Sequence, residues 1–408
     1  MKQIITILFL FTSHILIANT IVVGKDQVVT SLRKGVAMAL DGDTILLKKG
    51  IYKEGNMVIT RSIRLIGVDL PVLDGENKYE ILTVSGTRII IKGIHFKNSG
   101  YSSMNDYASI NLVDATYVVL ENNTIEHAYF AIHIGNTTNS IISNNIIIGT
   151  PKTEQTSGNG IHLWKCDSMI VEGNDVQGHR DGIYFEFVTN STISDNNSHA
   201  NIRYGLHFMF SNNDAYIENT FKENGAGVAV MYSHHVVMHS NVFEYNWGPN
   251  AYGLLLKEIS DATIIKNQFL QNTVGILMES TNRIDVQLNS FSNNGWAMRI
   301  QASCNENEIR YNNFRGNSFD VATNGTMMLN KFSNNYWDKY EGYDMNRDDV
   351  GDVPYHPVSM YSMVIEQNPN ALILMRSFMV SLLDKAEKAI PSLTPENLID
   401  EEPLMRAL

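Results

Sequence analysis

The chain has 408 residues and a formal net charge of -12 at pH 7. This acidic balance argues against nucleic acid as a partner, because binding to a phosphate backbone depends on Lys and Arg side chains that neutralise it. The length suits either several ordinary domains or one repetitive array, so internal repeats decide between these architectures.

Residues 1–18 have the pattern of a secretory signal peptide. Lys2 precedes an apolar run at residues 4–11, and the small residue Ala18 follows a short polar interruption. Export requires a basic segment, an apolar segment and a small residue at the cleavage point. A buried first strand is the alternative, but the short apolar run before a polar break favours an exported protein.

Residues 19–118 are predicted to form an N-terminal cap and entry coils. A short helical stretch is expected at residues 32–40, and strands are expected at residues 44–47, 63–66 and 88–94.

Residues 119–335 carry a repeat of about 22 residues, marked by an Asn that is followed two residues later by an apolar residue. A Gly that opens an apolar stretch recurs with the same period. Such a short period, with β-branched and aromatic segments between turn residues, fits three short strands per coil. We therefore predict an all-β, right-handed parallel β-helix, in which stacked Asn side chains form a hydrogen-bonded ladder at one corner. The Asn markers are Asn123, Asn145, Asn174, Asn196 (followed by the polar Ser198), Asn219, Asn241, Asn267, Asn289, Asn312 and Asn330.

An unusual outward column follows the Gly markers. The first and third residues after each Gly are apolar and should face the core, so the second and fourth should face outward. Imidazole and thioether groups in this column favour Cu(I) over hard cations, and neighbouring coils bring equivalent side chains to about 5 Å. The predicted copper ligands are His133, His162, His207, Met209 and Met231, with His234, His235, Met238 and His239 on the following strand.

The same column also supports a second interpretation. Trp164 and Tyr184, together with Met209 and Met231, could form an apolar patch for a partner protein. The patch and the copper site are compatible with each other.

A polysaccharide lyase, epimerase or hydrolase is the alternative function, because carbohydrate-active proteins often use this architecture. Glu186 and Glu279 on the column are four coils, or about 19 Å, apart, which is too far for a glycosidase pair. His179, Arg180 and Asp181 are better placed for acid or base chemistry, although such residues at a turn are commonly solvated.

The two cysteines, Cys166 and Cys304, are predicted to be free thiols. They lie six coils apart, about 29 Å, whereas a disulfide requires Cα atoms within about 7 Å. Small buried hydrophobic side chains are their expected role.

Residues 336–368 are predicted to be a closing loop region. Its Asp344, Asn346, Asp348 and Asp352 alternate oxygen ligands in a manner that could wrap Ca²⁺. Asp349 stands where such loops usually need Gly, and a solvated acidic turn is the alternative.

Residues 369–408 are predicted to be a helical tail that docks a partner. Apolar positions recur at helical spacing between residues 372 and 390, and the charged residues among them argue against a membrane span. The predicted docking residues are Leu372, Met375, Phe378, Met379 and Leu382.

Three separated motifs stand in the entry region, the closing region and the tail. Their residues are Gly42, Asp43, Thr44, Ile45, Gly50, Ile51, Tyr52, Glu54 and Gly55, then residues 334–340 with Gly342, Asp344, Asp348, Gly351, Asp352, Pro354 and Tyr355, and finally Glu366, Gln367, Pro369, Pro391, residues 393–396 and residues 403–405. In sequence and in order these motifs resemble the NosD family of nitrous oxide reductase maturation proteins.

The resemblance implies a periplasmic, non-catalytic component of an ABC-type system, with an ATPase and a permease as partners. Such a protein would receive copper from a small copper chaperone and pass it toward apo nitrous oxide reductase, and it would meet the membrane through the permease. The resemblance assigns no ligand residue here. The copper column therefore rests on the residues alone, and the tail would be the natural docking element for the permease.

Overall fold

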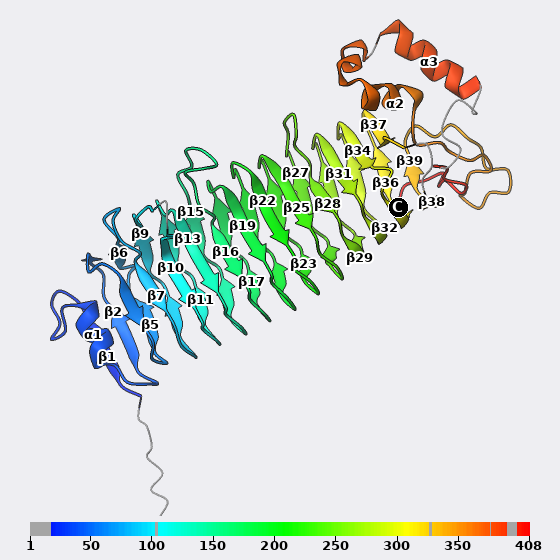
Figure 1. Ribbon diagram of the computed structural model, residues 1–408. Helices are drawn as coiled ribbons and strands as arrows, with labels where there is room; N and C mark the ends of the chain where they lie inside the picture. Colours follow the sequence, from blue (N-terminus) through cyan, green and yellow to red (C-terminus); the bar gives the residue numbers. More distant parts are fainter. Residues whose placement is uncertain (1–17, 103–104, 326–328, 376, 390–397) are drawn as a thin grey trace, which may run out of the picture.

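The computed structural model describes residues 18–102, 105–325, 329–375, 377–389 and 398–408. Short parallel strands stack along one axis into three long sheets, with helices at the two ends (Figure 1). This arrangement confirms the predicted parallel β-helix with three strands per coil. The predicted signal peptide, apart from Ala18, lies outside the described residues.

Sheet A has 14 strands and runs the full length of the solenoid. Its strands are β1 (Thr20–Val23), β2 (Thr44–Leu47), β5 (Arg64–Gly67), β8 (Ile90–Lys92), β11 (Val119–Glu121), β14 (Ile141–Ser143), β17 (Ile170–Glu172), β20 (Thr192–Ser194), β23 (Ala215–Ile217), β26 (Val237–His239), β29 (Ser260–Ile265), β32 (Asn282–Gln287), β35 (Asn305–Arg310) and β38 (Leu329–Ser333).

Sheet B has 13 strands and carries the aromatic part of the core. Its strands are β3 (Ile51–Tyr52), β6 (Val72–Asp74), β9 (His95–Lys97), β12 (Thr124–Glu126), β15 (Ile146–Ile148), β18 (Asp175–Gln177), β21 (Asn197–His199), β24 (Thr220–Lys222), β27 (Val242–Glu244), β30 (Gln268–Leu270), β33 (Ser290–Ser292), β36 (Asn313–Arg315) and β39 (Tyr336–Trp337).

Sheet C has 12 strands and carries the outward column. Its strands are β4 (Met57–Ile59), β7 (Leu82–Val84), β10 (Ala108–Val113), β13 (Phe130–Gly135), β16 (Ile161–Trp164), β19 (Asp181–Glu186), β22 (Tyr204–Met209), β25 (Ala226–Met231), β28 (Leu254–Lys257), β31 (Val274–Glu279), β34 (Trp296–Ile300) and β37 (Phe319–Thr323).

The entry region is more regular than predicted. Helix α1 (Leu32–Met38) forms where helix was expected and is capped by Ser31, whose side chain accepts from the Lys34 N–H. The strands of residues 19–118, however, already pair in register with the later coils. The strands expected at residues 44–47, 63–66 and 88–94 are present as β2, β5 and β8, and they stack on one another and on the later coils.

The Asn ladder is continuous. From Asn123 to Asn312, each side-chain amide donates to the Oδ1 of the Asn one coil ahead at 2.9 to 3.0 Å. The ladder continues through Asn335 and not through Asn330, which belongs to a different pair with Asn307. Because each amide also donates to a backbone carbonyl, the buried corners of the coils keep their hydrogen bonds.

The solenoid closes at its C-terminal end through a returning segment. Stacked rings run from Phe243 to Phe314 and end on Trp337, whose ring centroid lies 4.1 Å from that of Phe314. The buried carboxylate of Asp400 accepts from the Asn335 side chain and from the Trp337 indole, both at 3.0 Å. Residues 398–408 therefore form bridges to the last coil, and the predicted tail of 369–408 is helical only in part.

The helices beside this end differ from the expectation in two ways. Helix α2 (Met360–Gln367) lies within the predicted closing loop, and the predicted tail helix is divided into the 3-10 helix η1 (Pro369–Leu374) and α3 (Phe378–Ala389). Ser359 caps α2 by accepting from the Ser362 N–H. An ion pair of 2.7 Å between Arg299 and Glu366 joins α2 to sheet C.

Cys166 and Cys304 are both buried and free. Burial raises the pKa of the Cys166 thiol to about 11, so this side chain acts as a small hydrophobic group at neutral pH.

Candidate metal and docking site

The strand register confirms the outward column on sheet C. His133 pairs with His162, His162 with Tyr184, and Tyr184 with His207 on successive coils. Their ring centroids are 4.7 to 5.1 Å apart. Three predicted imidazole ligands therefore stand in one row, with a phenol between the second and the third.

The histidines of the column differ in exposure. His133 and His162 are half-buried, but His207 is only 3% exposed. The expectation of a fully exterior row is wrong at His207, because Tyr184 and Tyr204 pack against its ring. Tyr204 lies just before the marker Gly, a position that the sequence analysis did not include in the outward face.

All three imidazoles are neutral at ordinary pH. Burial lowers the pKa of His133, and it lowers the pKa of His162 and of His207 to about 3. The charge of Arg203 adds to the effect at His207. Neutral imidazole is the form that ligates metal ions.

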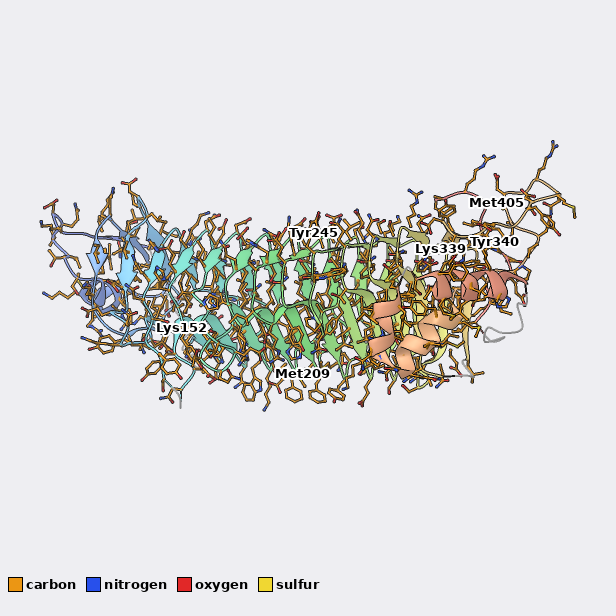
Figure 2. The ribbon with its side chains drawn as sticks, turned by 90° about the horizontal axis from the view of Figure 1, so that it is seen from above. Lys152, Met209, Tyr245, Lys339, Tyr340 and Met405 are labelled. Atoms are coloured by element: carbon orange, nitrogen blue, oxygen red, sulfur yellow. The ribbon has the colours of Figure 1, made fainter. Side chains whose placement is uncertain are left out.

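The thioethers stand in the neighbouring row. Met209 pairs with Met231 on the next coil, and the Tyr184 hydroxyl donates to the Met209 sulfur at 4.0 Å. Glu186 precedes this pair and Lys257 follows it in the row. Met209 projects along one long side of the solenoid, opposite the side that carries Tyr245 (Figure 2).

The remaining predicted copper ligands lie elsewhere. His234 and His235 are exposed at the corner before β26 of sheet A, with their Nδ1 atoms 2.7 Å apart. Met238 is fully buried in the core, so it cannot belong to an outward site. His239, half-buried on β26, is also on sheet A and not in the column.

An aromatic stack that the sequence analysis missed borders the thioethers. Phe187, Phe210 and Tyr232 follow the column strands on three successive coils, and their rings stack at 5.0 to 5.2 Å. All three are exposed and have φ near +50°, a conformation that bulky residues rarely adopt. An aromatic residue repeated directly after the fourth column position is the signal that could have found them.

The predicted partner residues of the column lie next to this stack. Trp164 and Tyr184 are half-buried, and Lys165 lies over the Trp164 ring at 4.3 Å. Together with Met209 and Met231 they form a mixed aromatic and thioether surface.

A buried ionic cluster lies at the edge of the column. Asp181 is fully buried, with the Nε of Arg180 at 3.5 Å and that of Arg203 at 3.6 Å. Burial raises the pKa of this carboxyl and the two arginines oppose that shift. Neither Asp181 oxygen has a hydrogen-bond partner, nor has the Nε2 of His179 or of His207. Unpaired buried polar atoms gathered in one place call for a specific explanation.

The side chains of the acidic closing loop accept hydrogen bonds from backbone N–H groups of the same loop. Asp344 accepts from the backbone N–H groups of Arg347, Asp348 and Asp349, and Asp352 accepts from that of Met345. Asn346 and Asp348 are hydrogen-bonded to each other at 3.0 Å. Asp349 has a φ of +66°, the conformation for which such loops use Gly. Calcium binding stays a prediction.

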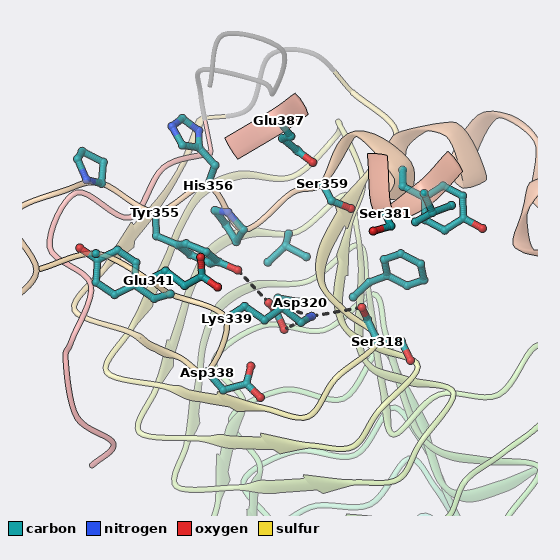
Figure 3. A pocket seen from close by; sticks show the side chains of 18 of the residues that line it. Ser318, Asp320, Asp338, Lys339, Glu341, Tyr355, His356, Ser359, Ser381 and Glu387 are labelled. Atoms are coloured by element: carbon teal, nitrogen blue, oxygen red, sulfur yellow. Dashed lines mark hydrogen bonds and ion pairs between the residues drawn. The ribbon is translucent and has the colours of Figure 1, made fainter. Parts of the chain in front are cut away.

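A cavity of about 1030 Å³ lies between the last coil and the helices. At its centre Asp320 accepts from the Tyr355 hydroxyl at 3.2 Å and from Lys339 at 3.3 Å (Figure 3). Lys339 and Tyr355 belong to the closing motif, so part of that motif builds this cavity wall. Burial raises the pKa of Asp320, and Lys339 opposes the shift.

The helical tail presents an apolar surface. Ile373 and Phe378 are 89% and 83% exposed, and Leu372, Met379 and Leu382 are also exposed. Met375 instead packs with the buried cluster of Phe319 and Tyr361. Four of the five predicted docking residues therefore face outward.

The residues that the structure describes were searched for membrane-spanning helices and for clusters of metal-ligating side chains. No helix in this part of the chain is long and apolar enough to cross a bilayer. No three His, Cys, Asp or Glu side chains converge there as a metal site would require.

Solved structures share the fold. A DFA-IIIase from Arthrobacter chlorophenolicus A6 matches with a TM-score of 0.51 and 14% identity, over 69% of this chain and 88% of that one. A Yersinia enterocolitica family 28 exopolygalacturonase matches with a TM-score of 0.50 and 8% identity, over 78% of each chain. At these identities the similarity concerns the fold alone.

Sequence similarity to curated proteins covers nearly the whole chain. The "Probable ABC transporter binding protein NosD" of Pseudomonas aeruginosa is 29% identical over 91% of this chain and 90% of its own length. The protein of the same name from Stutzerimonas stutzeri is 25% identical over 88% of this chain and 86% of its own. The family model described as "Periplasmic copper-binding protein (NosD)" matches residues 144–346. This chain belongs to the NosD family.

Proposed function

We propose that this protein is a periplasmic accessory protein of an ABC-type transport system that binds copper and delivers it for the maturation of nitrous oxide reductase. The family description and the names of the relatives support the periplasmic, copper and transporter parts. The enzyme, the small copper chaperone that donates the metal, and the ATPase and permease come from the family resemblance.

One observation carries the copper part. Two pairs of soft ligands stand in register on neighbouring coils of sheet C: His133 with His162, and Met209 with Met231 in the neighbouring row, where Met209 is two coils after His162. Soft ligands select Cu(I). Copper is cargo in this proposal, and the half-buried position of all four side chains suits two neighbouring positions that load and release the metal.

Anaerobic Cu(I) titration of the full mature chain against a chromophoric chelator tests this site. Replacing His133, His162, Met209 and Met231 together with Ala is expected to weaken Cu(I) binding more than about 100-fold, which exceeds the effect of losing one supporting residue. His95→Ala is the control, because His95 is half-buried on sheet B and paired with Glu126. Equal affinity in the wild type and the fourfold variant would contradict the column as the site.

We also propose that the exposed apolar side chains of η1 and α3 dock the permease. The helices stand out to one side of the last coils (Figure 1), and Ile373 and Phe378 are largely exposed. Residues that dominate interfaces are typically large and apolar. Ile373→Asp with Phe378→Asp is expected to weaken binding to the permease in nanodiscs at least about 30-fold. Ile51→Asp, at an equally apolar exposed site near the other end, is the control. Loss of binding in both variants would argue against a specific docking surface.

The buried ionic cluster around Asp181 supports a second candidate function, that of a polysaccharide lyase, epimerase or hydrolase. Asp181 is a buried acid whose pKa is raised, and it lies 4.0 Å from His207, which packs on Tyr184. Glu186 and Glu279 are four coils apart in one row and cannot act as a pair. Release of reducing sugars or unsaturated uronates from a polysaccharide panel, lost in Asp181→Asn, would favour this candidate over copper delivery.

A further inference from the structure

The three imidazoles of the column have different neighbours at Nδ1, and these neighbours determine which ring nitrogen carries the proton. A neutral imidazole has one N–H donor and one lone pair. Only the nitrogen with the lone pair can bind a metal ion, and the hydrogen bond at the other nitrogen decides which one that is.

At His133 the direction of the hydrogen bonds is fixed by a carboxylate. The Nδ2 of Asn111 donates to Glu80 at 3.0 Å, because a carboxylate can only accept. The Oδ1 of the same amide therefore faces His133 Nδ1, at 3.2 Å. His133 must donate from Nδ1, which leaves the lone pair on Nε2.

At His207 the direction is reversed by a guanidinium. The Nη2 of Arg203 lies 3.2 Å from His207 Nδ1, and an arginine can only donate. Nδ1 therefore holds the lone pair and Nε2 holds the proton. The Nε2–H group is buried without a partner. Binding a metal at Nε2 would require moving the proton to Nδ1, against the arginine.

His162 takes the pattern of His133 after a half-turn of one amide. The Nδ2 of Asn159 lies 3.2 Å from His162 Nδ1, while Asn159 Oδ1 is buried without a partner. A half-turn of this amide exchanges its two ends, and neighbouring groups decide which end faces the ring. After the turn Oδ1 accepts from His162, and Nδ2 becomes available to an acceptor on the next coil, where Asp181 has the same position.

We propose that Asn111 and Asn159 hold His133 and His162 with free Nε2 lone pairs for Cu(I), whereas Arg203 holds His207 as the Nε2–H tautomer and thereby removes it from the ligand set. Asn111, Asn159 and Arg203 are positioning residues in this scheme. The copper part rests on the proposed function, while the tautomers are a property of the metal-free protein.

Long-range 1H–15N correlation spectra of the metal-free full chain, labelled with 15N-histidine and assigned by single His→Gln variants, test the tautomers directly. His133 and His162 are expected to be protonated at Nδ1, and His207 at Nε2. Arg203→Met should release His207 from the Nε2–H form, and Asn111→Leu should release His133 from the Nδ1–H form. The same tautomer at all three rings, or His207 protonated at Nδ1, would overturn the inference.

Cu(I) affinity supplies the second readout. Asn111→Leu is expected to weaken Cu(I) binding about 10- to 100-fold, whereas Asn111→Asp combined with Glu80→Gln, which keeps both the acceptor at His133 and the hydrogen bond between residues 111 and 80, should retain it. His207→Gln should leave the affinity within about twofold, and a larger loss would contradict its exclusion. If the tautomers are as assigned but neither the wild type nor any variant binds Cu(I), the proposed function fails and the assignment of the tautomers stands.

Discussion

Replacing Asn219 with Ala is expected to lower the free energy of unfolding by about 3 to 5 kcal/mol. Asn219 is fully buried, and its amide donates to the Ile193 carbonyl and to Asn241. Its Oδ1 accepts from the backbone N–H and from the side chain of Asn196. Alanine leaves these groups buried without partners, and each unsatisfied group costs about 1 to 3 kcal/mol.

Urea unfolding followed by circular dichroism measures this effect. Asn250→Ala, at an exposed Asn outside the ladder, is the matched control and should change stability by less than about 0.5 kcal/mol. A loss in Asn219→Ala no larger than that of the control would mean that the ladder contributes little.

The second large effect concerns pH. Asp214 is buried, its Oδ1 accepts from the Ser191 N–H at 2.8 Å, and its Oδ2 has no partner. Burial, with a smaller contribution from the charge of Asp167, raises the pKa of Asp214 to about 8. The folded protein therefore keeps this proton while the unfolded chain releases it near pH 4.

The sign follows from that difference in proton binding. Rising pH favours the unfolded state, so stability is lost between about pH 4 and pH 8, by as much as about 4 kcal/mol at pH 7. Asp214→Asn keeps an acceptor for Ser191 without the charge, and we expect it to be more stable than the wild type at pH 7 and equal to it near pH 4. The exposed Asp195→Asn is the control, and parallel curves for Asp214→Asn and the wild type would refute the prediction.

Much of the fold could be predicted, because coil stacking repeats the same physical demands every 22 or so residues. A corner that needs a buried amide and strands that need alternating apolar residues leave regular marks in the sequence. The same marks predicted the rows of His133 with His162 and of Met209 with Met231. The prediction was wrong at one position of the ladder. Asn330 satisfies the marker pattern, but Asn312 donates to Asn335 and not to Asn330.

The finer features of the site depend on contacts between coils that no single repeat reveals. His207 has the same place in its coil as His133, but Arg203 and Tyr204 of its own coil enclose it. Asn111 and Glu80 support His133 from two earlier coils. Helix α2 was missed for another reason, since it packs on β37 after the repeat has ended.

The hydrogen bonds of Asp400 to Asn335 and Trp337 hold residues 398–408 against the last coil, and this affects how the molecule can associate. A stack of parallel strands ends in a row of backbone groups that could accept a strand from a second molecule, and exposed edges of this kind promote fibre growth. Here the chain's own final segment, from Leu398 onward, occupies much of that position and pairs with Tyr355 and Tyr336. Because residues 398–408 already pair with the last coil, we expect little end-to-end association of two solenoids through this edge.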